Sequence, residues 1–145
     1  MTITLAISVA QNFNFYVHYL RYKSGQETHR EFLLNGSPFG PQLIQIQELA
    51  DYIRERTTPT DQVYYWSEDV QFYYLVDRRC AIDIIWPFYV AATGPRERIF
   101  APATKYIIVD TSRPNPDWHW LYRELTKNYN LETVIYSQEI YHRLN

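Results

Sequence analysis

Lys105-Tyr-Ile-Ile-Val-Asp110 is the stretch that decides the fold. Tyr106 to Val109 form an uninterrupted apolar run that contains the β-branched residues Ile and Val. Such a run is typical of a strand that is buried on both faces, as central parallel strands are. The turn that follows, residues 110–116, is polar and contains prolines, which end the strand. We therefore predict a central strand with a polar turn at its carboxyl end.

A helix is predicted directly after this turn. Asn115 is a suitable N-cap, Pro116 suits the first helical position, and Asp117 places a negative charge near the positive end of the helix. Apolar and aromatic side chains then recur at helical spacing, namely at Trp118, Leu121, Tyr122, Leu125 and Tyr129. Another predicted strand, residues 131–136, follows this helix. The region is therefore predicted to form a β-α-β unit.

The rest of the chain supplies further elements of the same kinds. They are a helix from Pro41 that ends at Thr57-Thr-Pro59, a strand at 62–66, a short helix capped by Ser67, a strand at 80–85, and a final strand at 139–143. This order predicts an α/β domain over residues 41–145. We expect a three-layer sandwich with a mostly parallel, Rossmann-like sheet and an antiparallel C-terminal edge. Residues 1–40 are predicted to be an N-terminal membrane-proximal segment and linker.

The composition excludes some classes of function. The chain has 145 residues, a net charge of -2 and a pI of about 6.1, so it lacks the basic face of a nucleic-acid-binding protein. Its 14 Tyr, 7 Phe and 4 Trp are an unusually large aromatic share. Tyrosine and tryptophan suit membrane interfaces and sugar or protein contact faces. Tyrosines that fill the strands of a core are the alternative.

The N-terminal segment is apolar without being a good membrane span. Polar residues interrupt residues 2–20, and the segment has neither the basic start nor the cleavage site of a signal peptide. Phe13, Phe15 and Tyr16 crowd together just before basic residues. This pattern predicts a segment at a membrane interface, with an ordinary element packed on the domain as the alternative.

Candidate site residues follow the predicted parallel strands. Ligands of open α/β sheets bind beyond the carboxyl ends of the strands. Glu68 and Asp69 follow one strand, and Asp110 and Arg113 follow the central one, so these four residues are a possible ligand-binding rim. In a catalytic interpretation, Glu68 or Asp69 is the general base and Arg113 holds an anion. In the simpler interpretation, they only start a helix and form a turn.

The motifs of several enzyme classes are absent. With only four glycines, the chain contains neither a dinucleotide-binding loop nor a Walker loop, and no serine lies in a nucleophile elbow. The single cysteine, Cys80, allows no intrachain disulfide and is predicted to be a small buried residue. Trp120 is a possible contact for a sugar or a partner. We predict no catalytic residue, no cofactor and no metal site.

From about Gln45 to its end, the chain resembles the extracytoplasmic C-terminal domain of polytopic membrane glycosyltransferases related to dolichyl-phosphate-mannose–protein mannosyltransferases. Four stretches carry the resemblance: Glu48–Trp66, Val70–Arg79, Lys105–Asp110 and Tyr129–Arg143. Their shared features are a helix that ends in Ile-Arg-Glu, a Pro-x-Asp turn, a Val-Tyr-x-Trp strand and a Tyr-Tyr-Leu-x-x-Arg-Arg helix. Each motif is moderately specific, and their order over roughly 100 residues is more so.

The resemblance implies a function for the chain. Family members transfer a sugar from a polyprenyl-phosphate donor, and their catalytic carboxylate lies in the membrane portion or its first outer loop, which have no counterpart here. The chain would then be a soluble accessory domain at the extracytoplasmic face of the membrane, not catalytic alone. Its partners would be the membrane portion of the parent chain and the sugar donor or a glycan or protein acceptor. Residues 1–20 would follow or end the last membrane helix, and Met1 would be an artificial start.

Two other functions stay open. One is a free-standing small α/β enzyme that uses the rim at the carboxyl ends of the strands. The other is a protein-interaction module whose contacts include Trp120 and the tyrosine-rich faces.

Overall fold

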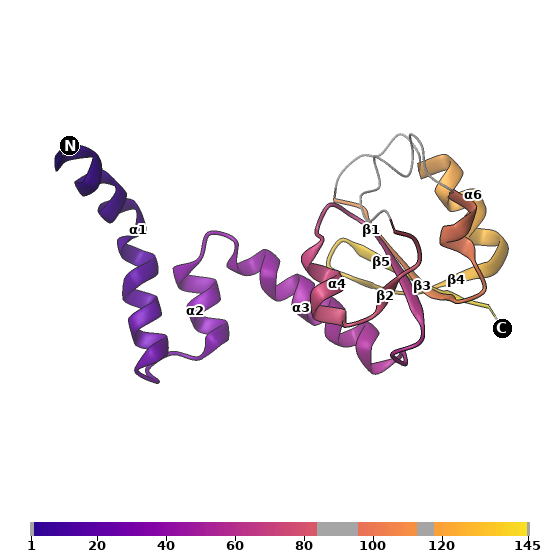
Figure 1. The fold of residues 1–145 in the computed structure, drawn as a ribbon, viewed down its shortest axis with the longest axis horizontal. Coiled ribbons are helices and arrows are strands. Elements are labelled where there is room, and N and C mark those ends of the chain that lie inside the picture. Colours follow the sequence, from indigo (N-terminus) through magenta and orange to yellow (C-terminus); the bar gives the residue numbers. More distant parts are fainter. Residues whose placement is uncertain (1, 84–95, 113–117, 145) are drawn as a thin grey trace. The chain divides into compact units, whose positions relative to one another are not determined.

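The computed structural model describes residues 2–83, 96–112 and 118–144 (Figure 1). The fold is mixed α/β. It divides into two compact units, Met1–Gln45 and Ile46–Asn145, and the division falls within helix α3 (Gly40–Glu55). Helix α3 matches the helix predicted from Pro41. Within the described ranges, no helix has the length and apolar character needed to cross a membrane.

The first unit is built on a helical hairpin. Helices α1 (Thr2–Lys23) and α2 (His29–Gly36) lie side by side, and Phe32 of α2 packs against Phe15 and Tyr22 of α1 with ring centroids 5.5 and 5.6 Å apart (Figure 1). Helix α2 was not among the predicted elements. Its signal was a capping box, in which Thr28 and Glu31 bond each other's backbone N–H groups at the helix start.

The second unit is built on a mixed sheet. Its described strands are β1 (Gln62–Trp66), β2 (Arg79–Cys80), β3 (Thr104–Asp110), β4 (Tyr129–Ile135) and β5 (Gln138–Arg143), in the order β2-β1-β3-β5-β4. Strand β3 is central and buried, as its apolar run predicts. The β1–β2 and β1–β3 pairs are parallel, whereas β3–β5 and β4–β5 are antiparallel. The prediction of a mostly parallel sheet is therefore wrong, and the sheet is half antiparallel.

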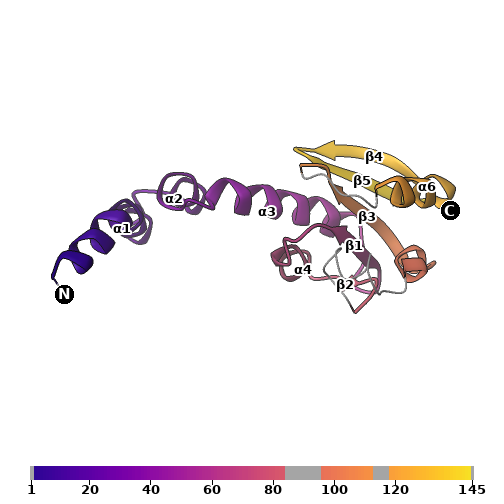
Figure 2. The ribbon, with the colours of Figure 1, turned by 90° about the horizontal axis from the view of Figure 1, so that it is seen from above.

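The position of β5 also differs from the prediction. Strand β4 is the edge of the sheet, and β5 lies between β3 and β4 (Figure 2). The tight turn at Tyr136 and Ser137, in which Tyr136 has a positive φ of 55°, folds β5 back along β4. Strand β5 then pairs with β3 on its other side. The predicted β-α-β unit is consequently split, because β5 separates its two strands.

Several helix and strand boundaries differ from those predicted. Ser67 does not cap a helix, because α4 (Gln71–Val76) begins later and its N-cap, Val70, makes no side-chain cap bond. Strand β2 ends at Cys80, and the chain bends at 81–83, where the strand predicted at 80–85 should continue. Residues 84 and 85 of that predicted strand lie outside the described residues. Cys80 is half-buried there rather than fully buried. A 3-10 helix, η1 (Arg96–Phe100), precedes β3. Helix α6 (Trp118–Asn128) follows the turn after β3, and its predicted cap at 115–117 lies outside the described residues.

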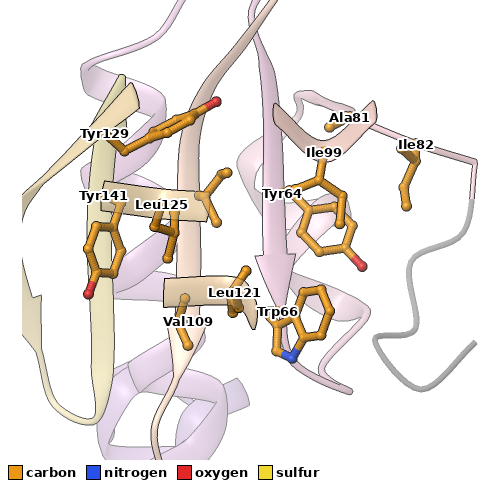
Figure 3. Close-up of a cluster of buried hydrophobic side chains, with 11 residues drawn as sticks. Tyr64, Trp66, Ala81, Ile82, Ile99, Val109, Leu121, Leu125, Tyr129 and Tyr141 are labelled. Atoms are coloured by element: carbon orange, nitrogen blue, oxygen red, sulfur yellow. The ribbon is translucent and has the colours of Figure 1, made fainter. Parts of the chain in front are cut away.

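The central strands carry apolar side chains on both faces. Successive side chains of a strand point to opposite faces, so one set packs with α3 and α4 and the other with α6 and η1. The first cluster takes from the strands Val63, Tyr65, Tyr106, Ile108 and Ile140. The second takes Tyr64, Trp66, Ile107, Val109 and Tyr141 (Figure 3).

Candidate ligand-binding rim

Strand register brings three polar segments together at one end of the sheet. Trp66 of β1 lies opposite Val109 of β3, so these parallel strands end side by side. Asp110, the last residue of β3, pairs with Gln138, the first residue of β5. We call the polar side chains that gather there the carboxyl-end rim. Its members are Ser67, Asp69, Asp110, Ser112, Ser137 and Gln138.

Ser67 joins two carboxylates of the rim. Its Oγ lies 3.4 Å from Oδ2 of Asp69 and 3.4 Å from Oδ2 of Asp110, and it accepts a hydrogen bond from the backbone N–H of Asp69 at 3.3 Å. A serine hydroxyl has one proton, so it donates to one of these carboxylates at a time. Two negatively charged groups therefore share a single donor at this point.

Asp110 shapes the turn that follows β3. Its Oδ1 accepts hydrogen bonds from the backbone N–H of Ser112 at 2.9 Å and from the Ser112 hydroxyl at 2.6 Å. Such a bond from an Asp side chain to the backbone two residues on is a common turn device. The Ser137 hydroxyl lies 3.5 Å from the same oxygen, and Thr111 donates to the Ser137 carbonyl from both its N–H and its hydroxyl, at 2.9 and 2.8 Å. The turn after β3 is thus bonded to the β4–β5 turn.

Gln138 is a buried member of the rim. Its exposed fraction is 9%, and its Nε2 donates to the Ser137 hydroxyl at 3.2 Å. Its Oε1 is buried and has no hydrogen-bond partner among the described residues. Because residues directly opposite each other on neighbouring strands share a face, the amide of Gln138 lies beside the Asp110 side chain.

The opposite face of this sheet end is aromatic. Figure 3 shows Trp66 at the end of β1, beside Leu121 and Val109. Its Nε1 is buried and, like Gln138 Oε1, lacks a hydrogen-bond partner in the described part of the chain. Trp120 packs on the Trp66 ring with centroids 6.2 Å apart.

The rim contains part of the predicted set of residues. Asp69 and Asp110 are brought together through Ser67, whereas Glu68 is exposed at the turn next to them. Arg113 lies outside the described residues. Neither Asp69 nor Asp110 forms an ion pair with any residue that the structure describes.

Sequence reasoning missed the contribution of the β4–β5 turn. Ser137 and Gln138 enter the rim because β5 pairs with β3, and that pairing links residues far apart in the chain. The available signal was the short polar turn between two predicted strands. Placing the second of these strands next to the central one, antiparallel to it, would have brought this turn to the carboxyl end of the central strand.

The predicted interface residues lie in different environments. Phe13 and Tyr16 are 63% and 56% exposed on α1. Phe15 is less exposed, at 37%, since it packs on Phe32. Trp120 is half-buried and lies under the Arg96 guanidinium, 5.1 Å from its ring.

The chemistry of the rim is that of oxygen donors and acceptors. Its groups are carboxylates, hydroxyls and one amide, which suit the hydroxyl groups of a ligand or a hard cation. No cluster of three or more His, Cys, Asp or Glu side chains that could hold a metal occurs in the described ranges. Comparison of the chain with protein-family models, with curated proteins and with solved structures finds no match. The interpretation of the rim therefore depends on its own geometry.

Proposed function

We propose that the chain is an accessory domain of a membrane glycosyltransferase that uses a polyprenyl-phosphate sugar donor. In this proposal it lies at the extracytoplasmic face of the membrane, next to the membrane portion of its parent chain. It positions the lipid donor or a glycan or protein acceptor and is not catalytic alone. The finer fold assignment, a three-layer sandwich, belongs to the same proposal.

The exposed aromatic stripe of α1 is the observation that carries this proposal. Phe13, Tyr16 and Leu20 follow the i, i+3, i+7 spacing of one helix face, and all three are largely exposed. A second stripe of α1, formed by Phe15, Tyr19 and Tyr22, packs on Phe32 of α2. The packing of α1 on α2 therefore does not bury the exposed stripe.

The surroundings of the stripe also suit a lipid surface. Arg21 and Lys23 lie in the last turn of α1, and Arg21 is exposed. Aromatic side chains concentrate at the boundary between lipid and water, and basic residues beside them attract anionic headgroups. This combination supports a helix that lies in the interface rather than one that crosses it.

The rim supports the second part of the proposal. Carboxylates and serine hydroxyls in one place bond well to the hydroxyl groups of a sugar. Among the described residues, the hydrogen-bond network of the rim contains no histidine or lysine that could serve as a base for a serine nucleophile. Both features are expected of a surface that holds a glycan without transforming it.

Vesicle flotation tests the membrane contact. We expect the full chain to float with vesicles of phosphatidylglycerol and phosphatidylcholine. The triple variant Phe13→Ser, Tyr16→Ser, Leu20→Ser should bind at least roughly a thousandfold more weakly, because each large side chain contributes about 1.5–3 kcal/mol on leaving water. Phe15 is left unchanged since it packs on Phe32 of α2.

The control variant is Tyr74→Ser, which removes an exposed aromatic side chain from α4 in the second unit. It should float like the unchanged chain. Circular dichroism of the triple variant should show unchanged helix content. Equal flotation of the triple variant and the unchanged chain would disprove the membrane contact.

A free-standing small α/β enzyme is the second candidate. The single observation in its favour is that Asp69 and Asp110 both lie 3.4 Å from the Ser67 hydroxyl. On this interpretation, turnover of a hydroxylated substrate by the chain alone would be lost in the Asp110→Asn variant.

A further inference from the structure

The carboxyl-end rim concentrates negative charge that no described basic residue balances. Asp69 and Asp110 each place an oxygen 3.4 Å from the same Ser67 hydroxyl, which has one proton to donate. Two carboxylates gathered around one hydroxyl repel each other, and a cation or a proton between them relieves that repulsion. The arrangement is therefore suited to a positively charged ligand.

The unpartnered amide oxygen of Gln138 is an independent sign of a missing ligand. A buried carbonyl oxygen without a partner is rare, because leaving it unpaired costs about 1–3 kcal/mol. Gln138 is 9% exposed, and its amide is bonded through the Ser137 hydroxyl to the Asp110 carboxylate. The free oxygen thus lies at the rim, on the strand directly beside Asp110.

The chemistry of the donors selects the kind of ligand. Every side-chain atom of the rim that could coordinate a metal ion is an oxygen, either charged or neutral. The rim contains neither sulfur nor imidazole. Thiolate and imidazole ligands favour zinc and copper, whereas carboxylate, carbonyl and hydroxyl oxygens favour calcium and magnesium. Calcium accepts irregular sets of six to eight oxygens that include amide carbonyls and waters.

We propose that the carboxyl-end rim binds a calcium-class divalent cation between the Asp69 and Asp110 carboxylates, with the amide oxygen of Gln138 as a neutral ligand. The hydroxyls of Ser67 and Ser137 are within reach to complete the set, together with water. The sequence alone predicted no metal site, since its residues are spread over three segments. Cation binding is a property of the chain alone and does not rest on the proposed glycosyltransferase function.

Terbium luminescence tests the proposal. Tb³⁺ replaces Ca²⁺ at oxygen sites and is excited by a nearby tryptophan, and Trp66 immediately precedes Ser67 in the chain. We expect saturable luminescence of the full chain that added Ca²⁺ displaces. The Asp69→Asn variant keeps the size of the side chain and should weaken binding by about tenfold or more, because one of the charged ligands is lost.

A gain-of-binding variant sharpens the test. Gln138→Glu replaces the neutral ligand with a carboxylate of the same shape, so it should tighten Ca²⁺ binding by about tenfold. Without a cation, the same variant adds a third negative charge to the rim and should lower the melting temperature. Its melting temperature should therefore rise with added Ca²⁺ more than that of the unchanged chain.

The control is Glu55→Gln, which removes one negative charge from an exposed position on α3 and should leave terbium binding unchanged. Circular dichroism verifies that each variant is folded, and Asp110→Asn serves as a second loss variant. Absence of saturable luminescence up to millimolar Tb³⁺ would overturn the proposal. Binding that neither Asp69→Asn nor Gln138→Glu changes would mean an adventitious ion only, and would overturn it equally.

Discussion

Glu132 accepts hydrogen bonds from the hydroxyls of Tyr52 and Tyr106, at 2.6 and 2.9 Å. Tyr52 belongs to α3 and Tyr106 to β3, so one carboxylate on β4 ties a helix and the central strand together. Glu139 plays the same part for Tyr122 of α6 and Tyr141 of β5, at 2.6 and 2.9 Å. These tyrosines therefore fix helices to the sheet, in favour of the core interpretation of the aromatic composition.

An irregularity of β4 explains why Glu132 reaches these partners. The pairing of β4 with β5 shifts register between Leu131 and Thr133, which places Glu132 at a bulge. Bulges re-aim a side chain relative to the regular alternation of a strand. Glu132 is thereby free to turn towards α3 and β3, while Leu131 remains exposed.

Replacement of Glu132 by Ala should destabilise the second unit by about 1–3 kcal/mol, because the Tyr52 and Tyr106 hydroxyls lose their acceptor. Urea unfolding followed by tryptophan fluorescence measures this difference. Glu55→Ala is the control, since the Glu55 side chain is exposed on the same helix as Tyr52. Equal stability of both variants would show that Glu132 is not needed to hold α3.

At the scale of elements, Arg78 joins the ends of two helices. Its guanidinium donates to the Arg54 carbonyl at 3.0 Å and to the carbonyl and hydroxyl of Thr57 at 2.9 Å each, all at the end of α3. It also donates to the Asp77 carbonyl at 2.8 Å, just after α4. The last carbonyls of a helix lack partners within the helix, so this arginine satisfies groups that would otherwise depend on water.

The Arg78→Lys variant should lose about 1–3 kcal/mol of stability, because a lysine ammonium cannot reach all of these acceptors with one fixed, planar group. Thermal and urea unfolding both measure the loss. Arg79→Lys is a matched control at the next, exposed position. If the Arg78→Lys variant is as stable as the Arg79→Lys control, the hydrogen bonds of Arg78 make no net contribution to stability.

The elements differ in how well local sequence predicts them. Helix α3 follows from its apolar stripe, and β3 follows from its uninterrupted apolar run. Helix α2 was missed because it is short and its apolar residues, Phe32, Leu33 and Leu34, form one run without helical periodicity. What stabilises it is Phe32, which packs on aromatic side chains of α1. That contact is tertiary and has no signature within residues 29–36.

At the scale of the whole molecule, burial holds many tyrosines in their protonated form. Desolvation raises the pKa of Tyr64, Tyr73 and Tyr129 above the ordinary 10.0. Desolvation also raises the pKa of Tyr122 and Tyr141, and the Glu139 carboxylate adds to this effect. In the unfolded chain these groups return to ordinary values.

Stability should therefore fall in alkaline solution. The folded state keeps protons that the unfolded chain releases, so the contribution of these tyrosines is complete below about pH 10 and is lost as the pH rises further towards their folded pKa values. We expect tyrosine ionisation, followed by ultraviolet difference absorbance, to coincide with loss of the near-ultraviolet circular dichroism. Ionisation of all tyrosines near pH 10 in a chain that stays folded would contradict the prediction.

The amino-acid sequence alone determined that the fold is mixed α/β, that β3 is a buried central strand, and that Asp69 and Asp110 follow strand ends. Each of these conclusions rests on a local pattern, since the period of apolar residues reports which faces of an element are buried. Only the tertiary structure decided the strand order, which places β5 next to β3 and so brings Ser137 and Gln138 to the rim. The apolar run of a central strand reports that both of its faces are buried. It does not specify which strand pairs with it or in which direction, because a strand with other neighbours would be buried in the same way.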